Sequence, residues 1–140
     1  MLKTTLLHPE ILGALASNGH GAKVLIADGN YPFTTGAPPA AKKVYLNLSP
    51  GRLSVAEVLK VLVEFIPIER AVVMVPPDER APEIHQEFQS IIGPQVQLTN
   101  LKRFEFYDEA KSPETCLVIA TGEIQRFANI LLTIGVVRAE

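Results

Sequence analysis

The most informative stretch of this chain is Asn18-Gly-His-Gly-Ala-Lys-Val-Leu-Ile-Ala-Asp28-Gly-Asn-Tyr-Pro32. Val24 to Ala27 is a short apolar run that favours a β-strand, and Asp28-Gly-Asn30 is a turn signature. Two titratable side chains, His20 and Asp28, therefore bracket one buried strand. The strand spans only about 13 Å, and the loop before it can fold back. We therefore expect both groups to reach one pocket.

The composition is that of a globular protein. The chain has 140 residues, of which 47% are hydrophobic and 20% charged, and its net charge is −2. We expect a single domain over residues 1–140. Nucleic acid is not expected as a partner, because the few basic residues are scattered rather than clustered.

Three features of the sequence indicate the cellular compartment: the first residues, the length of the apolar stretches and the single cysteine. The first residues are too short in their apolar part for a signal peptide, and no apolar stretch reaches the length of a membrane span. Cys116 is alone, lies in an apolar run and has no metal-ligand spacing around it, so we expect a buried structural thiol. These features predict a soluble cytoplasmic protein with no membrane partner.

Helices and strands alternate along the sequence. Apolar residues at helical spacing predict helices over residues 8–16, 55–66, 82–92 and 103–111, the second behind a Ser54–Glu57 capping box and ended by Pro67. β-prone runs predict strands over residues 24–27, 43–48, 71–75, 96–101, 116–120 and 129–133. This alternation predicts an α/β three-layer sandwich with a largely parallel central sheet.

Taken alone, each residue of the opening stretch has a plain structural role as its alternative. His20 could cap the end of the preceding helix, and Asp28 could simply organise its own turn. The two glycines beside His20 resemble part of a dinucleotide fingerprint, but the order here is helix, glycines, strand. A phosphate site needs strand, glycines, helix, so the order found here argues against nucleotide binding at these glycines.

Other candidates lie in the second half of the chain. Arg103 and Tyr107 are four residues apart and share one helical face, where they could hold hydroxyls or a carboxylate. Glu123 is either a general base or, as its turn suggests, a turn carboxylate. His8 and His85 are predicted to be surface residues. No His, Cys and carboxylate spacing indicates a metal site.

Five segments together carry a resemblance to a known family. They are Asn18 to Pro32, Arg103-Phe-Glu-Phe-Tyr107, Ala120-Thr-Gly-Glu123, Phe127-Ala-Asn-Ile130 and Gly135-Val136. In this order, and over nearly the whole chain, they resemble the RbsD/FucU family of ribose pyranases and fucose mutarotases. The fucose mutarotase branch is the more similar one, because the ribose branch usually has histidine where this chain has Arg103.

The resemblance implies an isomerase that acts on a monosaccharide without a cofactor. It implies that His20 is the catalytic acid/base and that Asp28 and Arg103 bind sugar hydroxyls. The segment Phe127-Ala128-Asn129 would line the pocket through backbone and side-chain contacts. Ring opening and closure need one proton given and one taken, which imidazole can do near neutral pH.

The family further implies a homo-oligomer, either a pentameric ring or a decamer, with its pocket near subunit contacts. One residue departs from the family pattern, because Phe127 stands where tyrosine is common. The lost hydroxyl leaves two alternatives open beside the fucose-type mutarotase: a sugar-binding protein without catalysis, and pyranose–furanose exchange of the ribose pyranase type. Tyr107 could supply a substitute hydroxyl.

Overall fold

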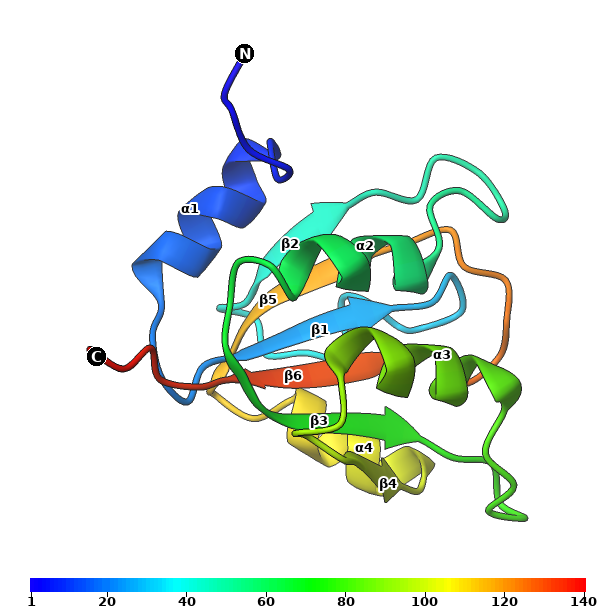
Figure 1. Ribbon diagram of the computed structural model, residues 1–140. Coiled ribbons are helices and arrows are strands. Elements are labelled where there is room, and N and C mark those ends of the chain that lie inside the picture. The colour runs from blue at the N-terminus through cyan, green and yellow to red at the C-terminus, as the bar shows by residue number, and fades with distance from the viewer.

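The computed structural model describes residues 1–140 and has a six-stranded sheet with four helices (Figure 1). The strands are β1 (Lys23–Ala27), β2 (Lys42–Tyr45), β3 (Ile68–Met74), β4 (Leu98–Leu101), β5 (Thr115–Ala120) and β6 (Ile130–Ile134). The helices are α1 (Pro9–Ser17), α2 (Val55–Leu62), α3 (Glu83–Ile92) and α4 (Arg103–Ala110). All ten elements occur where the sequence predicts them.

The sheet has the strand order β2-β5-β1-β6-β3-β4. β6 runs antiparallel to β1 and β3, and every other neighbouring pair is parallel. The predicted α/β fold with a largely parallel sheet is therefore confirmed. Because β6 is reversed, its amino end lies at the same edge as the carboxyl ends of β1 and β3.

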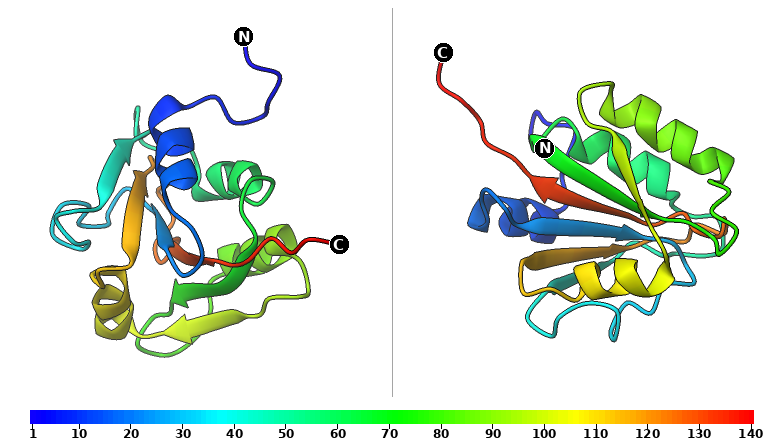
Figure 2. Two further views of the ribbon diagram at one scale, coloured as in Figure 1. Left: turned by 90° about the vertical axis from the view of Figure 1, so that its left-hand side faces the viewer. Right: turned by 90° about the horizontal axis from the view of Figure 1, so that it is seen from below.

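Both faces of the sheet are covered, as the two views of Figure 2 make clear. In β1, Val24 and Ile26 point into a core shared with α1, α2 and α3, while Leu25 and Ala27 point into a second core under α4. This alternation follows from the two-residue period of a strand. It explains why the run is apolar at every position, as expected for a strand covered on both sides.

Three elements differ from the predicted bounds by three or four residues at one end. β2 ends at Tyr45, because that residue pairs with Ala120, the last residue of its only neighbour β5. α2 ends at Leu62, where the chain tightens into turns before Pro67, a residue that disfavours helix just ahead of it. β3 begins at Ile68, earlier than predicted, because its polar start still pairs with β6.

The prediction that His85 is a surface residue is wrong. His85 lies in α3 and is only 4% exposed. Its ring stacks on Phe88 at a centroid distance of 6.0 Å, and its Nε2 lies 2.8 Å from the carbonyl oxygen of Phe127. His85 precedes Phe88 by three residues, which places both on the inner stripe of the helix.

Cys116 is half-buried, and burial raises the pKa of its thiol.

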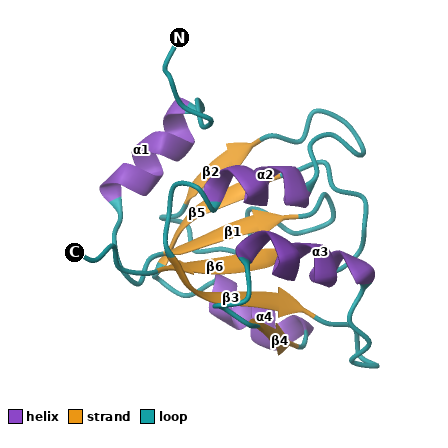
Figure 3. Ribbon diagram, viewed as in Figure 1, coloured by secondary structure: helices purple, strands orange, loops and turns teal.

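Loops gather at the carboxyl edge of the sheet, on the right in Figure 3. The turn after β1, the segment before β6 and the start of α4 all meet there. Each helix is too short or too polar to cross a lipid bilayer. The carboxyl edge is the usual place for ligands in open α/β sheets.

Candidate active site

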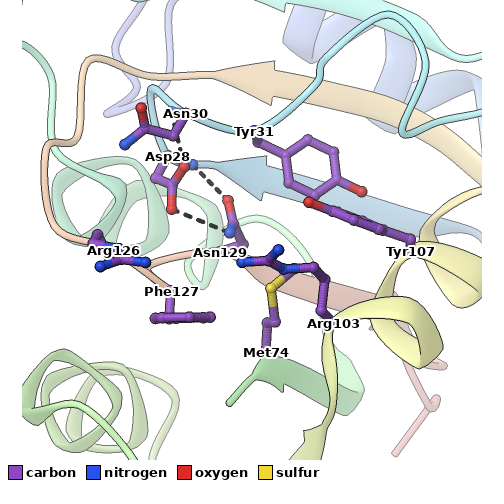
Figure 4. Close-up of a pocket in the computed structure, with 9 residues that line it drawn as sticks. All are labelled: Asp28, Asn30, Tyr31, Met74, Arg103, Tyr107, Arg126, Phe127 and Asn129. Atoms are coloured by element: carbon purple, nitrogen blue, oxygen red, sulfur yellow. Dashed lines mark hydrogen bonds between the residues drawn. The ribbon is translucent and has the colours of Figure 1, made fainter. Parts of the chain in front are cut away.

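A cavity of about 440 Å³ lies at this edge, within the usual size range of small-molecule sites. The residues that line it come from the ends of strands and from the loops that follow them (Figure 4). They are Asp28, Asn30, Tyr31, Met74, Arg103, Tyr107, Arg126, Phe127 and Asn129. Five of the residues that the sequence singled out therefore share one cavity: Asp28, Arg103, Tyr107, Phe127 and Asn129.

Asp28 and Asn129 form the best-ordered part of the site. The Asn129 side chain accepts a hydrogen bond from the Asp28 backbone N–H at 2.7 Å and donates one to the Asp28 carboxylate at 3.1 Å. Both residues are buried. The amide can satisfy donor and acceptor at once, and it thereby locks two segments that lie a hundred residues apart in the chain.

The Asp28 carboxylate has further donors of its own. The backbone N–H of Asn30 donates to it at 3.0 Å, and that of Ala128 at 3.3 Å. Burial raises the pKa of the Asp28 carboxyl, and these hydrogen bonds to the ionised form oppose that rise. Asp28 is thus both the turn residue and the cavity carboxylate, the two roles that the sequence left open.

The segment before β6 carries a strained residue. Phe127 has a φ of 59°, a left-handed conformation that a non-glycine residue rarely adopts. Its ring lines the cavity and lies under the Arg126 guanidinium, 5.6 Å from the ring centroid. Ala128 is fully buried and takes part through its backbone N–H rather than through its side chain.

α4 supplies the opposite wall. Arg103 and Tyr107 both line the cavity from one face of this helix, as their spacing predicted. Tyr31 packs edge-on against Tyr107 at a centroid distance of 5.5 Å. The Tyr31 hydroxyl donates to the carbonyl of Gly36 at 2.7 Å, and burial raises the pKa of this hydroxyl. Tyr31 therefore shapes the wall, whereas the ring of Tyr107 extends from α4 toward the other side chains that line the cavity (Figure 4).

His20 does not line this cavity. It lies before β1, at the amino edge of the sheet, whereas Asp28 follows β1 at the carboxyl edge. The five residues of β1 separate them by about 16 Å of strand. Its Nε2 lies 2.9 Å from a Glu69 carboxylate oxygen at the surface. The prediction that this loop folds back and brings His20 to the pocket of Asp28 is therefore wrong for a single chain. The Gly21 N–H donates to the Ile134 carbonyl and holds the loop at the amino edge.

Glu123 is a turn carboxylate, the role that its sequence context suggested. It is buried, and it accepts hydrogen bonds from the backbone N–H groups of Val55 and Gln125 at 3.4 and 3.0 Å. It therefore ties the loop after β5 to the first residue of α2. It does not line the cavity beside Asp28.

The sequence missed four of the lining residues: Asn30, Tyr31, Met74 and Arg126. Arg126 directly precedes Phe127, and Asn30 and Tyr31 follow Asp28. Their position next to a predicted site residue was the only sign in the sequence that they line the cavity. Met74 gave none, because it lies in the apolar run Ala71 to Val75, which the sequence predicts as a buried strand. No group of three or more His, Cys, Asp or Glu side chains is placed to hold a metal ion.

Comparisons with known proteins agree with this geometry. The model of the RbsD / FucU transport protein family matches residues 1–137. The chain is 33% identical to the human protein named fucose mutarotase, with 94% of this chain and 90% of that protein covered. It is also 33% identical to the D-ribose pyranase of Variovorax paradoxus (strain S110), with 97% and 98% covered.

Solved structures give the same result. Bacillus subtilis RbsD complexed with D-ribose superposes with a TM-score of 0.85 at 26% identity, covering 99% of this chain and 100% of that one. This match in fold extends over the whole sheet and its helices, and the sequence matches extend over the same length. The chain belongs to the RbsD/FucU family.

Proposed function

We propose that this protein is a monosaccharide mutarotase that exchanges the α and β pyranose anomers of a fucose-type sugar by acid/base ring opening at His20. The observation that carries the proposal is the Asp28–Asn129 pair in a cavity of about 440 Å³. At the coarser level, the chain is a sugar isomerase of a family that contains a fucose mutarotase and D-ribose pyranases. It has no cofactor in this scheme, and we place it in the cytoplasm.

In this reaction the protein has to transfer protons and position the sugar. A proton must reach the ring oxygen while another leaves the anomeric hydroxyl, after which the open aldehyde turns and closes on its other face. A positioned imidazole can perform both transfers near neutral pH, an effect typically worth about 10²- to 10⁴-fold in rate. No covalent intermediate is needed.

The cavity residues suit a sugar that must be held through several hydroxyls. Asp28 can accept a hydrogen bond from a hydroxyl, and the Arg103 guanidinium can donate to one. The Asn129 amide donates a hydrogen bond to the Asp28 carboxylate and so fixes its position. Phe127 offers an aromatic surface to the apolar face of the sugar ring, and the Ala128 backbone keeps the carboxylate in place. Tyr107 supplies a hydroxyl in place of the one that Phe127 lacks.

His20 would act from a neighbouring copy of the chain, because one chain keeps it at the far edge of the sheet. Exposed apolar side chains lie beside both halves of the site, which favours such a contact. Phe104, next to Arg103, is 74% exposed, and Val137, beyond β6 at the edge of His20, is 83% exposed. A ring of copies, as a pentamer or a decamer, would bring one copy's His20 to the next copy's Asp28.

Subunit complementation tests this arrangement directly. His20→Ala and Asp28→Asn should each abolish the enzyme's acceleration of anomer exchange, measured by saturation-transfer NMR. If His20 acts across the interface, randomly mixed oligomers of the two variants regain about a quarter of the sites. Purified His20→Ala mixed with itself and refolded is the control. Mixtures that stay inactive, while refolded wild type is active, would refute action across the interface.

Two other functions have a specific observation behind them. Phe127 in place of a tyrosine favours a sugar-binding protein without catalysis, and the D-ribose pyranase relatives favour pyranose–furanose exchange. A panel of pentoses and hexoses in anomer-resolved NMR separates the three. If calorimetry detects sugar binding but anomer exchange is no faster than in buffer, the protein binds sugar without catalysis. If only the pyranose–furanose exchange of ribose is accelerated, the protein is of the ribose pyranase type rather than the fucose type.

A further inference from the structure

One peptide group links the buried histidine of α3 to the carboxylate in the cavity. The Phe127 carbonyl oxygen lies 2.8 Å from His85 Nε2, and the N–H of Ala128, which belongs to the same peptide, donates to Asp28 at 3.3 Å. His85 and Asp28 therefore hold opposite sides of one rigid plane. A rotation of that plane would break both hydrogen bonds together.

The identity of its partner fixes the protonation of His85. A carbonyl oxygen only accepts, so Nε2 must carry the proton that it donates. Nδ1 is then the unprotonated nitrogen, and it is buried with no hydrogen-bond partner. Burial lowers the pKa of His85, which favours this neutral form.

Packing alone does not account for a histidine at this place. His85 is 4% exposed and its ring stacks on Phe88. An apolar side chain would fill these surroundings without leaving a buried nitrogen such as Nδ1 unpaired. What an apolar side chain could not supply is a donor to Phe127, whose left-handed φ of 59° must be held by its surroundings. The donor and the strained residue meet at one atom.

We propose that His85 is a positioning residue: its Nε2–H holds the Phe127–Ala128 peptide in the strained orientation that keeps the Ala128 N–H on Asp28. His85 acts through this peptide and touches no substrate. Its effect on turnover rests on the function proposed above, whereas its effect on the peptide does not. It extends the site from the cavity lining to α3 on the opposite face of the sheet.

Two polar substitutions separate the donor from the bulk of the ring. In His85→Gln the side-chain amide nitrogen can occupy the place of Nε2, whereas the shorter His85→Asn places its amide near the position of Nδ1. We expect hydrogen exchange of the Ala128 amide, relative to that of Ile26 in β1, to be at least about tenfold faster in the Asn variant, the effect of losing one ordinary hydrogen bond. The Gln variant should stay within about threefold of wild type.

Sugar kinetics give a second readout. The Asn variant should raise KM for the sugar more than it lowers kcat, because Asp28 is misplaced while His20 is untouched, and the Gln variant should restore KM. If the Gln and Asn variants share the same Ala128 exchange rate, the donor has no positioning role and the proposal falls. A sugar panel with no exchange in wild type would instead end the proposed function and leave the amide result standing.

A measurement on the unaltered protein covers the case in which the variants do not fold. The ¹⁵N signals of a labelled histidine ring distinguish a protonated from an unprotonated nitrogen. We expect His85 to show a protonated Nε2, an unprotonated Nδ1 and a through-bond coupling to the Phe127 carbonyl. The opposite tautomer would overturn the assignment, since its Nε2 cannot donate.

Discussion

His20 Nε2 and a Glu69 carboxylate oxygen lie 2.9 Å apart at the amino edge of the sheet, on the side away from the cavity that holds Asp28. Both side chains are about half exposed, at 59% and 45%. An exposed pair of this kind contributes little to stability, about 1 kcal/mol at most. Glu69 therefore orients the imidazole without binding it firmly, which leaves the ring available for the action on a neighbouring copy that we propose.

Glu69→Gln should change the free energy of unfolding by less than about 1 kcal/mol, measured by urea titration. The matched control is Glu109→Gln. Glu109 is less exposed, at 27%, and pairs with Arg70 at 2.5 Å and with Lys23 at 3.9 Å. We expect the Glu109 variant to be the less stable of the two. A larger loss for Glu69→Gln would contradict the view that the His20 contact is a loose surface pair.

Asp28→Asn should destabilise the fold as well as impair the sugar site. Whichever way the new amide turns, its NH2 group replaces one carboxylate oxygen. Either the Asn30 N–H or both the Ala128 N–H and the Asn129 amide then lose their acceptor. The expected loss is about 1–3 kcal/mol of unfolding free energy. Asp78→Asn is the control, because the Asp78 carboxylate accepts only from the Arg80 backbone in an exposed turn. Equal stability of the two variants would contradict the role given to the buried cluster.

Phe127→Tyr and Tyr107→Phe test whether a hydroxyl at either position assists the proposed reaction. Both rings line the cavity, so a hydroxyl added to Phe127 would restore the family's group, and one removed from Tyr107 would delete its substitute. We expect Phe127→Tyr to raise kcat/KM for the sugar and Tyr107→Phe to lower it by about tenfold, the effect of one hydrogen bond. Anomer-exchange NMR measures both. No change in either variant would show that neither hydroxyl is used.

Gly122→Ala should destabilise the loops behind the cavity. A Cβ at Gly122 would lie 1.9 Å from the Arg52 carbonyl oxygen and 2.4 Å from that of Ser49, and both are backbone atoms. We expect a loss of about 1–3 kcal/mol, typical of overpacking. Gly13→Ala is the opposite control: Gly13 lies in α1 with nothing near its Cβ position, and alanine should add up to about 1 kcal/mol through helix propensity. Thermal melts of both variants check this contrast.

Burial of His85 predicts an acid-sensitive fold. Its folded-state pKa is lowered, so below the ordinary value of about 6.5 the unfolded chain binds a proton that the folded chain does not. Stability from this group is therefore fully present above that pH and is lost as the pH falls through the folded pKa. The slope should not exceed about 1.4 kcal/mol per pH unit. Urea midpoints between pH 7 and 5 should fall less in His85→Gln than in wild type, and parallel profiles would contradict the assignment.

Local patterns in the sequence were enough to predict the order of elements. The apolar run from Val24 to Ala27 and the helical spacing behind the Ser54 capping box are short-range signals, and the structure has both elements there. The end of β2 at Tyr45 was not predictable in this way, because it is set by where the partner strand β5 ends. Strand ends depend on pairing, which is a long-range contact.

The residues of the site likewise divide into those placed by short-range signals and those placed by long-range contacts. Local spacing predicts that Asp28 follows a buried strand and that Arg103 and Tyr107 share a helical face, since both relationships span a few residues. Three further relationships exist only in the folded chain: Asp28 contacts Asn129, His85 is buried against Phe127, and His20 lies at the far edge of the sheet. A strand holds its two ends apart, and a parallel sheet with one reversed strand brings distant segments together at one edge. Sequence spacing carries neither relationship.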